Sequence, residues 1–146
     1  MKDVEILLVE DDPNHAELTL MALREGNLGP IHLAPDGEEA LRFLFSGDLA
    51  ERKLKLILLD LKLIKLDGLE LLRRIRSDPR TRHLPVVVLT SSLNERDIRT
   101  SYDYGANSYI VKPLEFEKFI RTVSQLGTYW VRLNQPPVVT GEASEG

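Results

Sequence analysis

Short runs of apolar residues alternate along this chain with longer segments in which apolar residues recur every three or four positions. The short runs are typical of buried parallel strands, and the longer segments are typical of helices that cover a sheet. We therefore predict an α/β fold with a doubly wound, five-stranded parallel sheet and five helices. The predicted strands lie near residues 4–9, 30–34, 56–60, 85–89 and 108–111.

Capping residues predict where the first two helices begin. Pro13 is tolerated in a first helical turn, so Asp12 should cap a helix that continues to Gly26. Asp36 stands three residues before Glu39, which is the spacing of a capping box with reciprocal bonds. The second helix should therefore begin directly after Asp36.

The third and fourth helices have similar boundary signals. Gly68 opens the third helix, and Asp78-Pro79 ends it because a residue before proline avoids the helical conformation. Ser92 and Glu95 have the spacing of a second capping box, which predicts a fourth helix that ends at Gly105.

The last helix is predicted over residues 115–133, roughly 28 Å long. Its apolar face consists of Phe116, Phe119, Ile120, Val123, Leu126, Trp130 and Leu133. Late in this helix, Tyr129 and Trp130 either close the core or form a protein interface. Residues 1–133 would then be one domain with an extended last helix, and residues 134–146 a disordered tail.

Composition narrows the classes of partner. The net charge is −4, and no basic stripe is visible, which argues against nucleic acid because binding to its phosphate backbone needs one. The chain has no cysteine, so disulfides and thiolate metal sites are excluded. No apolar segment reaches the roughly 20 residues of a membrane span. We expect a cytoplasmic protein that binds neither nucleic acid nor membrane.

Polar residues mark the ends of four predicted strands. Glu10 and Asp11 follow the first strand, Asp60 ends the third, and Thr90 and Lys112 follow the fourth and fifth. Because the carboxyl ends of parallel strands meet at one edge of a sheet, where ligands bind, we expect these groups to converge. Oxygen ligands of this kind suit Mg²⁺. If Mg²⁺ and Lys112 neutralise the phosphoryl oxygens, the Asp60 carboxylate could attack phosphorus.

Each of these residues also has a purely structural interpretation. A strand-terminal aspartate often caps a helix, Thr90 alone is a turn hydroxyl, and Lys112-Pro113 alone is a surface turn. The joint pattern favours a functional site, because four separate strand ends each carry the residue type that phosphoryl chemistry needs.

The same residues resemble the signature of a known family. Over residues 4 to about 133, the chain resembles the receiver domain of bacterial two-component response regulators, through Glu10-Asp11, Asp60, Thr90, Tyr109 and Lys112-Pro113. That resemblance implies the CheY-like, flavodoxin-like fold with strand order 2-1-3-4-5. A narrower resemblance, which rests on residues 84–90, Tyr129-Trp130 and a long segment before the third strand, is to single-domain regulators paired with bacterial and cyanobacterial phytochrome kinases.

The resemblance implies a role for each matched acidic residue. Asp60 would be the phosphoacceptor and a ligand of Mg²⁺. Asp11 would bind the metal directly and Glu10 would bind it through water. The backbone carbonyl of Lys62 would complete the ligands that the protein supplies.

It also implies roles for the remaining matched residues. Lys112 would hold the phosphoryl group, with a cis peptide bond before Pro113. Thr90 would be a switch residue that moves toward a phosphoryl oxygen, and Tyr109 would swing inward behind it. The alternative for Tyr109 is a half-buried residue of the sheet.

The chain departs from the family pattern beside Asp60. Many members have a proline where this chain has Ile64. Lys62 and Ser92 occupy two positions at which members tune the lifetime of the phosphate, and we hypothesise that Lys62 alters autodephosphorylation. His15 lies near the acidic edge and is interpreted as an exposed helix residue, with kinase docking as the alternative.

These expectations describe a single-domain response regulator in a phosphorelay, which is not an enzyme beyond its own phosphotransfer and autodephosphorylation. A histidine kinase, in the narrower resemblance a bacteriophytochrome, would phosphorylate Asp60. The face made by the fourth helix, fifth strand and fifth helix would then change its protein contacts. A downstream phosphotransfer protein is a further partner. A homodimer through helices four and five would use Ile98, Tyr102 and Trp130.

Two other functions share parts of this pattern. A Mg²⁺-dependent phosphohydrolase with an aspartyl nucleophile would need a general acid two residues after Asp60, where the chain has Lys62. A flavin-binding module would need a loop rich in hydroxyls and amides after the first strand. The acidic segment Glu10-Asp11-Asp12 would repel the flavin phosphate without a metal.

Overall fold

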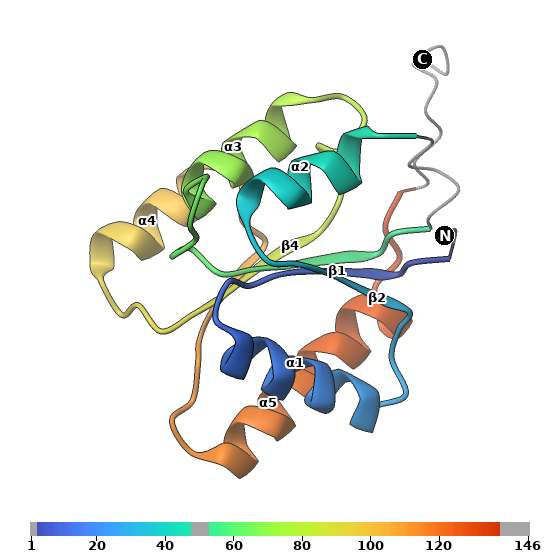
Figure 1. Ribbon diagram of the computed structural model, residues 1–146, viewed down its shortest axis with the longest axis vertical. Helices are drawn as coiled ribbons and strands as arrows, with labels where there is room; N and C mark the ends of the chain where they lie inside the picture. The colour runs from blue at the N-terminus through green and yellow to red at the C-terminus, as the bar shows by residue number, and fades with distance from the viewer. Residues whose placement is uncertain (1–2, 48–52, 138–146) are drawn as a thin grey trace.

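The computed structural model of the chain describes residues 3–47 and 53–137, which form one parallel sheet with helices on both faces (Figure 1). In chain order the elements are β1 (Ile6–Val9), α1 (Pro13–Glu25), β2 (Ile31–Ala34), α2 (Gly37–Phe45), β3 (Leu56–Leu59), α3 (Gly68–Ser77), β4 (Val86–Thr90), α4 (Glu95–Asp103), β5 (Ser108–Val111), α5 (Phe116–Thr128) and the π-helix η2 (Tyr129–Leu133). None of the helices in the described ranges is long and apolar enough to cross a membrane.

The sheet has the order β2-β1-β3-β4-β5, as the family resemblance implies, and every neighbouring pair is parallel, as the sequence pattern predicts. Helices α1 and α5 cover one face, and α2 and α3 cover the other (Figure 1). Every residue of β1 and β3 is buried, which explains why these strands are continuous apolar runs. Their side chains alternate: Leu7 and Val9 join the core under α2 and α3, while Ile6 and Leu8 join the core under α1 and α5.

The predicted boundaries of α1 and α3 are confirmed. The carboxylate of Asp12 accepts hydrogen bonds from two backbone N–H groups of the first turn of α1, and Gly26 is the C-cap of that helix. Helix α3 begins at Gly68 and ends immediately before Asp78-Pro79. Cap chemistry therefore decides the start of α1, and proline sterics decide the end of α3.

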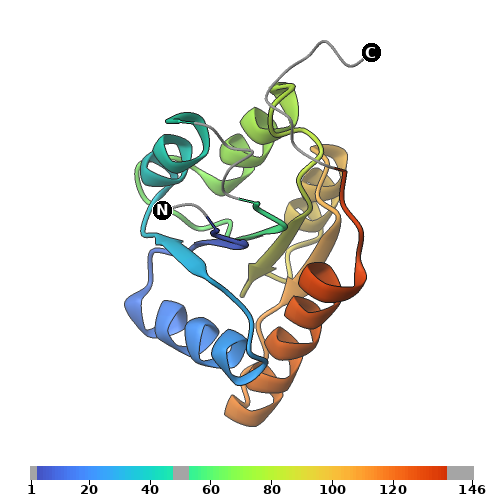
Figure 2. The ribbon, with the colours of Figure 1, turned by 90° about the vertical axis from the view of Figure 1, so that its right-hand side faces the viewer.

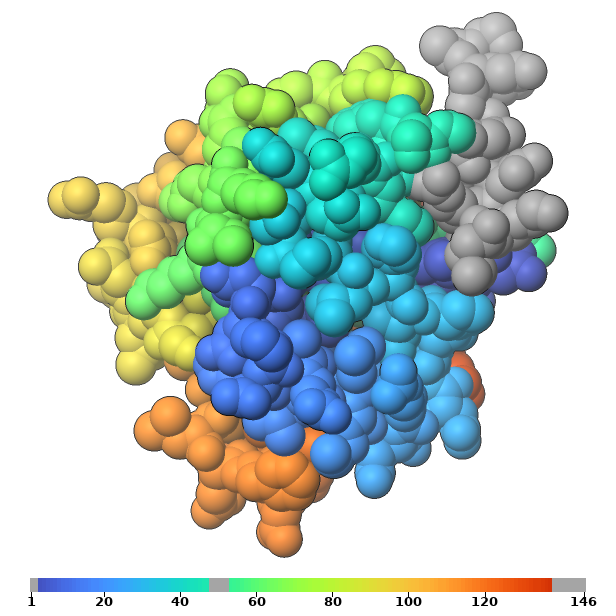
Figure 3. Space-filling view, viewed as in Figure 1, coloured from blue at the N-terminus to red at the C-terminus, as the bar shows by residue number. Residues whose placement is uncertain are grey.

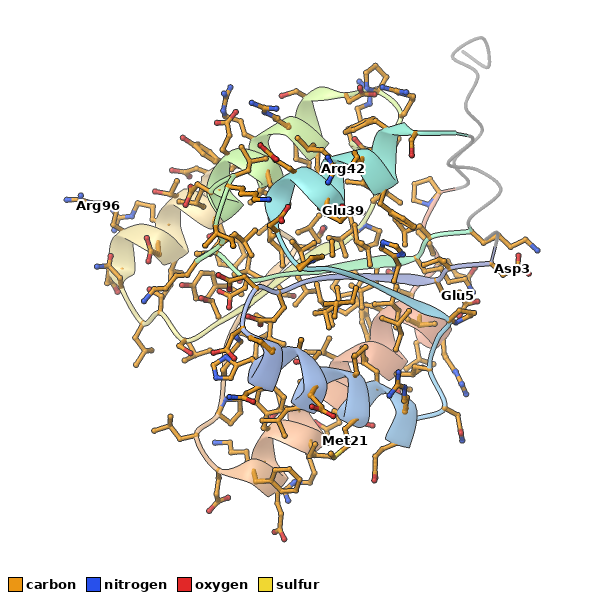
Figure 4. All side chains as sticks on the ribbon, in the orientation of Figure 1. Asp3, Glu5, Met21, Glu39, Arg42 and Arg96 are labelled. Atoms are coloured by element: carbon orange, nitrogen blue, oxygen red, sulfur yellow. The ribbon has the colours of Figure 1, made fainter. Side chains whose placement is uncertain are left out.

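The capping box of α2 forms only in part. Asp36 accepts a hydrogen bond from the backbone N–H of Glu39 at 2.8 Å, as predicted. The carboxylate of Glu39 does not return to Asp36, because it bonds the guanidinium of Arg42 at 2.6 Å instead. The two side chains point toward one another on the outer surface of α2 (Figure 4).

The predicted capping box of Ser92 and Glu95 is wrong. Asn94 caps α4, and its side chain accepts hydrogen bonds from two backbone N–H groups of the first turn. The hydroxyl of Ser92 donates instead to the carboxylate of Asp97 at 2.6 Å. Asn94 and Ser92 are both favoured residue types at an N-cap position, so residue type alone does not predict which of them caps α4. The predicted end of α4 is confirmed: Tyr104 is the C-cap, and Gly105 follows it with a φ of 104° and terminates the helix.

The last helix is regular up to its final turns, where η2 replaces α-helix. A π turn holds more residues than an α turn and therefore rotates the side chains that follow it. Phe116 and Leu133, which were predicted on the apolar face, are 53% and 67% exposed, whereas Val131 is buried. Both assignments to the apolar face are wrong: Leu133 lies in η2, whereas Phe116 is the first residue of α5 and is unaffected by the π turn. Of the predicted tail, residues 138–146 lie outside the described part of the chain.

Candidate functional site

Four strand ends bring buried polar side chains together at the carboxyl edge of the sheet. Glu10 follows β1, Asp60 follows β3, Thr90 ends β4 and Lys112 follows β5, and their exposed fractions are 3%, 7%, 0% and 6%. The hydrogen-bond ladder continues past two strands. The N–H of Asp60 donates to the carbonyl of Val9 at 3.1 Å, and the N–H of Lys112 donates to that of Thr90 at 2.7 Å. The sheet itself thereby fixes where these residues stand.

Hydrogen bonds hold both carboxylate oxygens of Asp60. Oδ1 accepts from the hydroxyl of Thr90 at 2.9 Å and from the backbone N–H of Lys62 at 3.1 Å. Oδ2 accepts from the ammonium of Lys112 at 2.8 Å. The carboxylate is consequently oriented by donors from three different segments of the chain.

The ammonium of Lys112 is the cation shared by this cluster. Its Nζ lies 2.7 Å from Oε1 of Glu10, 2.8 Å from Oδ2 of Asp60 and 2.8 Å from Nδ1 of His15.

In the described residues the cis peptide bond is Gly29-Pro30, so the bond before Pro113 is trans and the predicted cis bond is wrong.

The two buried carboxyl groups have opposite pKa shifts. Burial, with the nearby charge of Asp60, raises the pKa of Glu10 to about 7, and the hydrogen bond from Lys112 only partly offsets this. Burial also acts to raise the pKa of Asp60, but the hydrogen bond and charge of Lys112 outweigh it, helped by the donors Lys62 and Thr90. The pKa of Asp60 therefore lies below its usual value and the group stays ionised.

The donor set suits a hard divalent cation in its chemistry. Glu10 and Asp60 are buried carboxylates with one ammonium between them, and Asp11 stands half-exposed beside them at the end of β1. All of these side chains offer oxygen, which Mg²⁺ and Mn²⁺ prefer. Among residues 3–47 and 53–137, no three acidic or imidazole groups already stand close enough to hold a metal ion. In this arrangement Lys112 provides the positive charge.

Tyr109 connects β5 to the loop between β4 and α4. Its hydroxyl donates to the backbone carbonyl of Ser92 at 2.9 Å, and its half-buried ring packs against the core under α2 and α3. Burial raises the pKa of the Tyr109 hydroxyl, so it remains a donor at neutral pH. The ring already points inward, next to the loop that follows Thr90.

Gly68 allows α3 to start directly beside Asp60. A Cβ at this position would lie 2.6 Å from the backbone carbonyl oxygen of Asp60 and 2.6 Å from Cα of Leu61. Both contacts are with backbone, which has little room to move. A glycine is therefore required where the loop after β3 returns to the sheet.

Sequence reasoning missed His15. It was interpreted as an exposed helix residue, but its ring reaches the buried ammonium of Lys112. The available signal was its place in the first turn of α1, directly after the acidic strand end. Lys62, by contrast, contacts Asp60 through its backbone N–H, and its side chain is exposed.

A separate groove of about 800 Å³ lies away from this cluster, between α2 and α3, which run side by side in the space-filling view (Figure 3). It is lined by Glu38, Leu41, Arg42, Phe45, Ser46, Arg74, Ser77, Asp78 and Pro79. None of these residues belongs to the carboxyl edge, so the groove plays no part in the chemistry of Asp60.

Comparison of sequences shows a family and many relatives, among them two that cover most of this chain. The model of the response regulator receiver domain matches residues 6–124. The probable methanogenesis regulatory protein FilR2 of Methanothrix harundinacea is 44% identical over 134 residues, which cover 90% of this chain and 86% of that protein. Response regulator Rcp1 of Synechocystis sp. is 35% identical over 129 residues, which cover 86% of this chain and 88% of Rcp1.

Solved structures of the same kind superpose closely on this chain. The phosphorylated cyanobacterial phytochrome response regulator RcpA has a TM-score of 0.84 and 37% identity, over 92% of this chain and 99% of RcpA. The Mn²⁺-bound form of Rcp1 has a TM-score of 0.82 and 34% identity, over 92% of this chain and 99% of Rcp1. Rcp1 is thus similar to this chain in both sequence and fold.

Proposed function

The chain belongs to the response regulator receiver family, and on this premise we propose that it is a response regulator that accepts a phosphoryl group on Asp60. The observation that carries the proposal is the set of contacts around that carboxylate. Thr90 and Lys112 donate to its opposite oxygens, and its lowered pKa keeps it ionised and nucleophilic. We assign residues 1–133 to the receiver unit, since η2 still packs on the core through Val131.

The chemistry is a transfer between two nucleophiles. An oxygen of Asp60 attacks the phosphorus of a phosphohistidine, so that a P–O bond forms as the P–N bond breaks. The electron pair of the broken bond stays on the imidazole nitrogen of the donor. Lys112 is placed to neutralise the oxygens of the transferred group, and Thr90 can turn its hydroxyl to one of them.

We propose Mg²⁺ as the metal, held by Asp11, Asp60 and the carbonyl of Lys62, with Glu10 bound through water. Such an ion would neutralise charge on the phosphoryl oxygens. The Mn²⁺-bound form of Rcp1 supports a divalent cation in this family. The strong burial of Glu10 and Asp60 also favours one, because a single ammonium leaves the pKa of Glu10 raised to about 7.

The proposed phosphodonor is a histidine kinase, and a downstream phosphotransfer protein is the proposed acceptor. The similarity to RcpA, a phytochrome response regulator, supports a bacteriophytochrome as that kinase. Because another relative comes from Methanothrix, the rates of phosphotransfer from two kinases can be compared. Faster transfer to Asp60 from a purified bacteriophytochrome than from a kinase of a methanogenic archaeon would support the phytochrome pairing. The reverse order would contradict it.

We propose that the output surface consists of α4, β5 and α5, which gather along one side of the molecule (Figure 2). Tyr102 on α4 is 51% exposed, while Ile98 and Trp130 are half-buried. A homodimer through this surface would cover all three. Sedimentation with and without beryllofluoride, a phosphoryl analogue, tests it, and a monomer under both conditions would contradict the dimer.

The decisive experiment is treatment with a small-molecule phosphodonor and Mg²⁺, followed by intact mass. Wild type should gain one phosphoryl group and Asp60→Asn should gain none. Asp67→Asn is the matched control, since Asp67 is an exposed aspartate of the same loop and should be labelled like wild type. Labelling of Asp60→Asn would contradict the assignment of Asp60.

Incubating the same proteins with a phosphomonoester separates the regulator from a phosphohydrolase. A regulator is labelled stoichiometrically, whereas a hydrolase releases phosphate from a phosphomonoester at a steady rate. Lys62, which occupies the place of a hydrolase's general acid, is exposed and carries no carboxyl group. Steady release by wild type that is lost in Asp60→Asn would favour the hydrolase instead.

A further inference from the structure

The ring of His15 touches the ammonium of Lys112 as closely as the two carboxylates do. The distance from Nδ1 to Nζ is 2.8 Å, compared with 2.7 Å and 2.8 Å for the contacts to Glu10 and Asp60. An ammonium group has three N–H donors. These three contacts account for all of them.

The geometry requires that Nδ1 accept the hydrogen bond. Lys112 offers only donors, and an imidazolium would bring a second positive charge to 2.8 Å from its ammonium. The neutral ring must therefore carry its hydrogen on Nε2 and turn the lone pair of Nδ1 toward Nζ. The carboxylate of Asp12 lies 4.0 Å from Nδ1, beyond hydrogen-bond distance, and does not compete for it.

The backbone of His15 is anchored at the start of α1. Its N–H donates to the capping carboxylate of Asp12 at 3.3 Å, and its carbonyl accepts from the buried hydroxyl of Thr19 at 2.8 Å. The side chain of His15 is 39% exposed, while that of Lys112 is 4% exposed. The ring therefore bridges a fixed helical turn at the surface and a buried cation.

We propose that His15 is a positioning residue for phosphotransfer, which holds the Lys112 ammonium beside Asp60; this inference rests on the proposed function. An incoming phosphoryl group competes with both carboxylates for the charge of Lys112. His15 is the uncharged acceptor of the three and takes no part in the reaction. Its hydrogen bond can keep Nζ of Lys112 at the end of β5 while the contacts to Glu10 and Asp60 give way to the incoming phosphoryl group.

A matched pair of variants tests the acceptor directly. In His15→Asn the amide oxygen stands where Nδ1 stood, whereas His15→Leu has a similar size and no acceptor. With a small-molecule phosphodonor, His15→Leu should be phosphorylated about tenfold more slowly, the loss expected for one hydrogen bond to a charged group. His15→Asn should stay within about twofold of wild type, as should His83→Leu, the same change at an exposed histidine. Equal rates for His15→Leu and wild type, or equal slowing of both His15 variants, would overturn the proposal.

An NMR measurement reads the same contact without phosphorylation. A long-range ¹H–¹⁵N spectrum should show His15 as the Nε2–H tautomer, with an Nδ1 signal that shifts in Lys112→Met. A hydrogen on Nδ1, or a signal unaffected by Lys112→Met, would refute the role of His15 while leaving phosphorylation of Asp60 untouched. Absence of label on Asp60 would instead refute the proposed function.

Discussion

Glu10 and Asp60 share one ammonium group, yet only Glu10 holds its proton more tightly than usual. Its pKa rises from 4.5 to about 7 in the folded protein. Between these values the folded state binds a proton that the unfolded chain has already released. Without a divalent cation, Glu10 therefore reduces stability as pH rises through this window, and the reduction is complete above pH 7.

Glu10→Gln should consequently stabilise the metal-free protein at pH 8 by about 1 to 3 kcal/mol. The difference from wild type should shrink as pH falls toward 5, because wild-type Glu10 is then protonated. Urea unfolding in the presence of a chelator, at several pH values, measures it. Glu17→Gln is the control at an exposed site and should show no such trend. A Glu10→Gln variant less stable than wild type at pH 8 would contradict the prediction.

Lys62 is the residue that we expect to set the lifetime of the phosphorylated state. Its N–H already bonds Asp60 at 3.1 Å, so its exposed side chain begins next to the carboxylate and can shield it from water. Lys62→Ala should lose its phosphoryl group about two- to tenfold faster than wild type. Decay of labelled protein, followed by intact mass, measures the rate, with Lys118→Ala on α5 as control. Identical decay in Lys62→Ala and wild type would sink the idea.

At the residue scale, the sequence predicts the position of a side chain best where that side chain stands at the end of a strand. Glu10, Asp60, Thr90 and Lys112 could be placed together because parallel strands end at one edge. His15 could not, because the direction of a side chain from a helical turn depends on how that helix packs on the sheet. That packing is a property of the tertiary structure.

At the scale of single elements, α4 is held mainly by its caps and loops. Ser101 is the residue of this helix that is buried, so hydrophobic burial contributes less here than in α1 or α5. The N-terminal turn depends on Asn94, whose side chain bonds two N–H groups. Ser92 and Asp97 join the preceding loop to the same turn.

Asn94→Ala should therefore cost about 1 kcal/mol of stability, the usual value of a lost N-cap. Glu95→Gln should stay within about 0.5 kcal/mol of wild type, since Glu95 makes no capping bond. Urea unfolding of the two variants tests which residue caps the helix. A larger loss for Glu95→Gln than for Asn94→Ala would restore the capping box predicted from the sequence.

The π-helical end of the last helix shows a second limit at this scale. A constant helical period placed Leu133 on the apolar face, and the period changes at Tyr129. The spacing of apolar residues up to Leu126 does not predict that change. Where the signals at the helix ends and the apolar period are regular, as in α1 and α3, the sequence predicts the boundaries correctly. Where the hydrogen-bond pattern shifts, the faces of the helix shift with it.

For the whole molecule, topology follows from a few rules applied to the pattern of elements. Parallel strands joined by helices must form right-handed crossovers, which limits the possible orders. The resemblance to receiver domains then selected the observed β2-β1-β3-β4-β5. Long-range polar contacts between loops were not predictable in this way, because they join residues with no shared period. Arg76 is the clearest example.

Arg76, near the end of α3, joins the two connections that enter β4 and β5. Its guanidinium donates to the carbonyls of Gly105, Arg82 and Leu84 and to the side-chain oxygen of Asn107, at 2.9, 3.2, 2.7 and 2.8 Å. Burial lowers the pKa of Arg76, and no carboxylate compensates for it in these contacts. Its bonds therefore fix the loops that enter β4 and β5.

Arg76→Met should destabilise the protein by about 2 to 4 kcal/mol, because four oxygen acceptors, two of them in part-buried contacts, lose their donor at once. Arg76→Lys should recover little, since an ammonium cannot reproduce the planar fork. Arg73→Met removes an exposed arginine of the same helix that pairs with Glu70, and it should cost less than about 1 kcal/mol. Equal losses for Arg76→Met and Arg73→Met in urea unfolding would mean that the loops before β4 and β5 are held by the sheet alone.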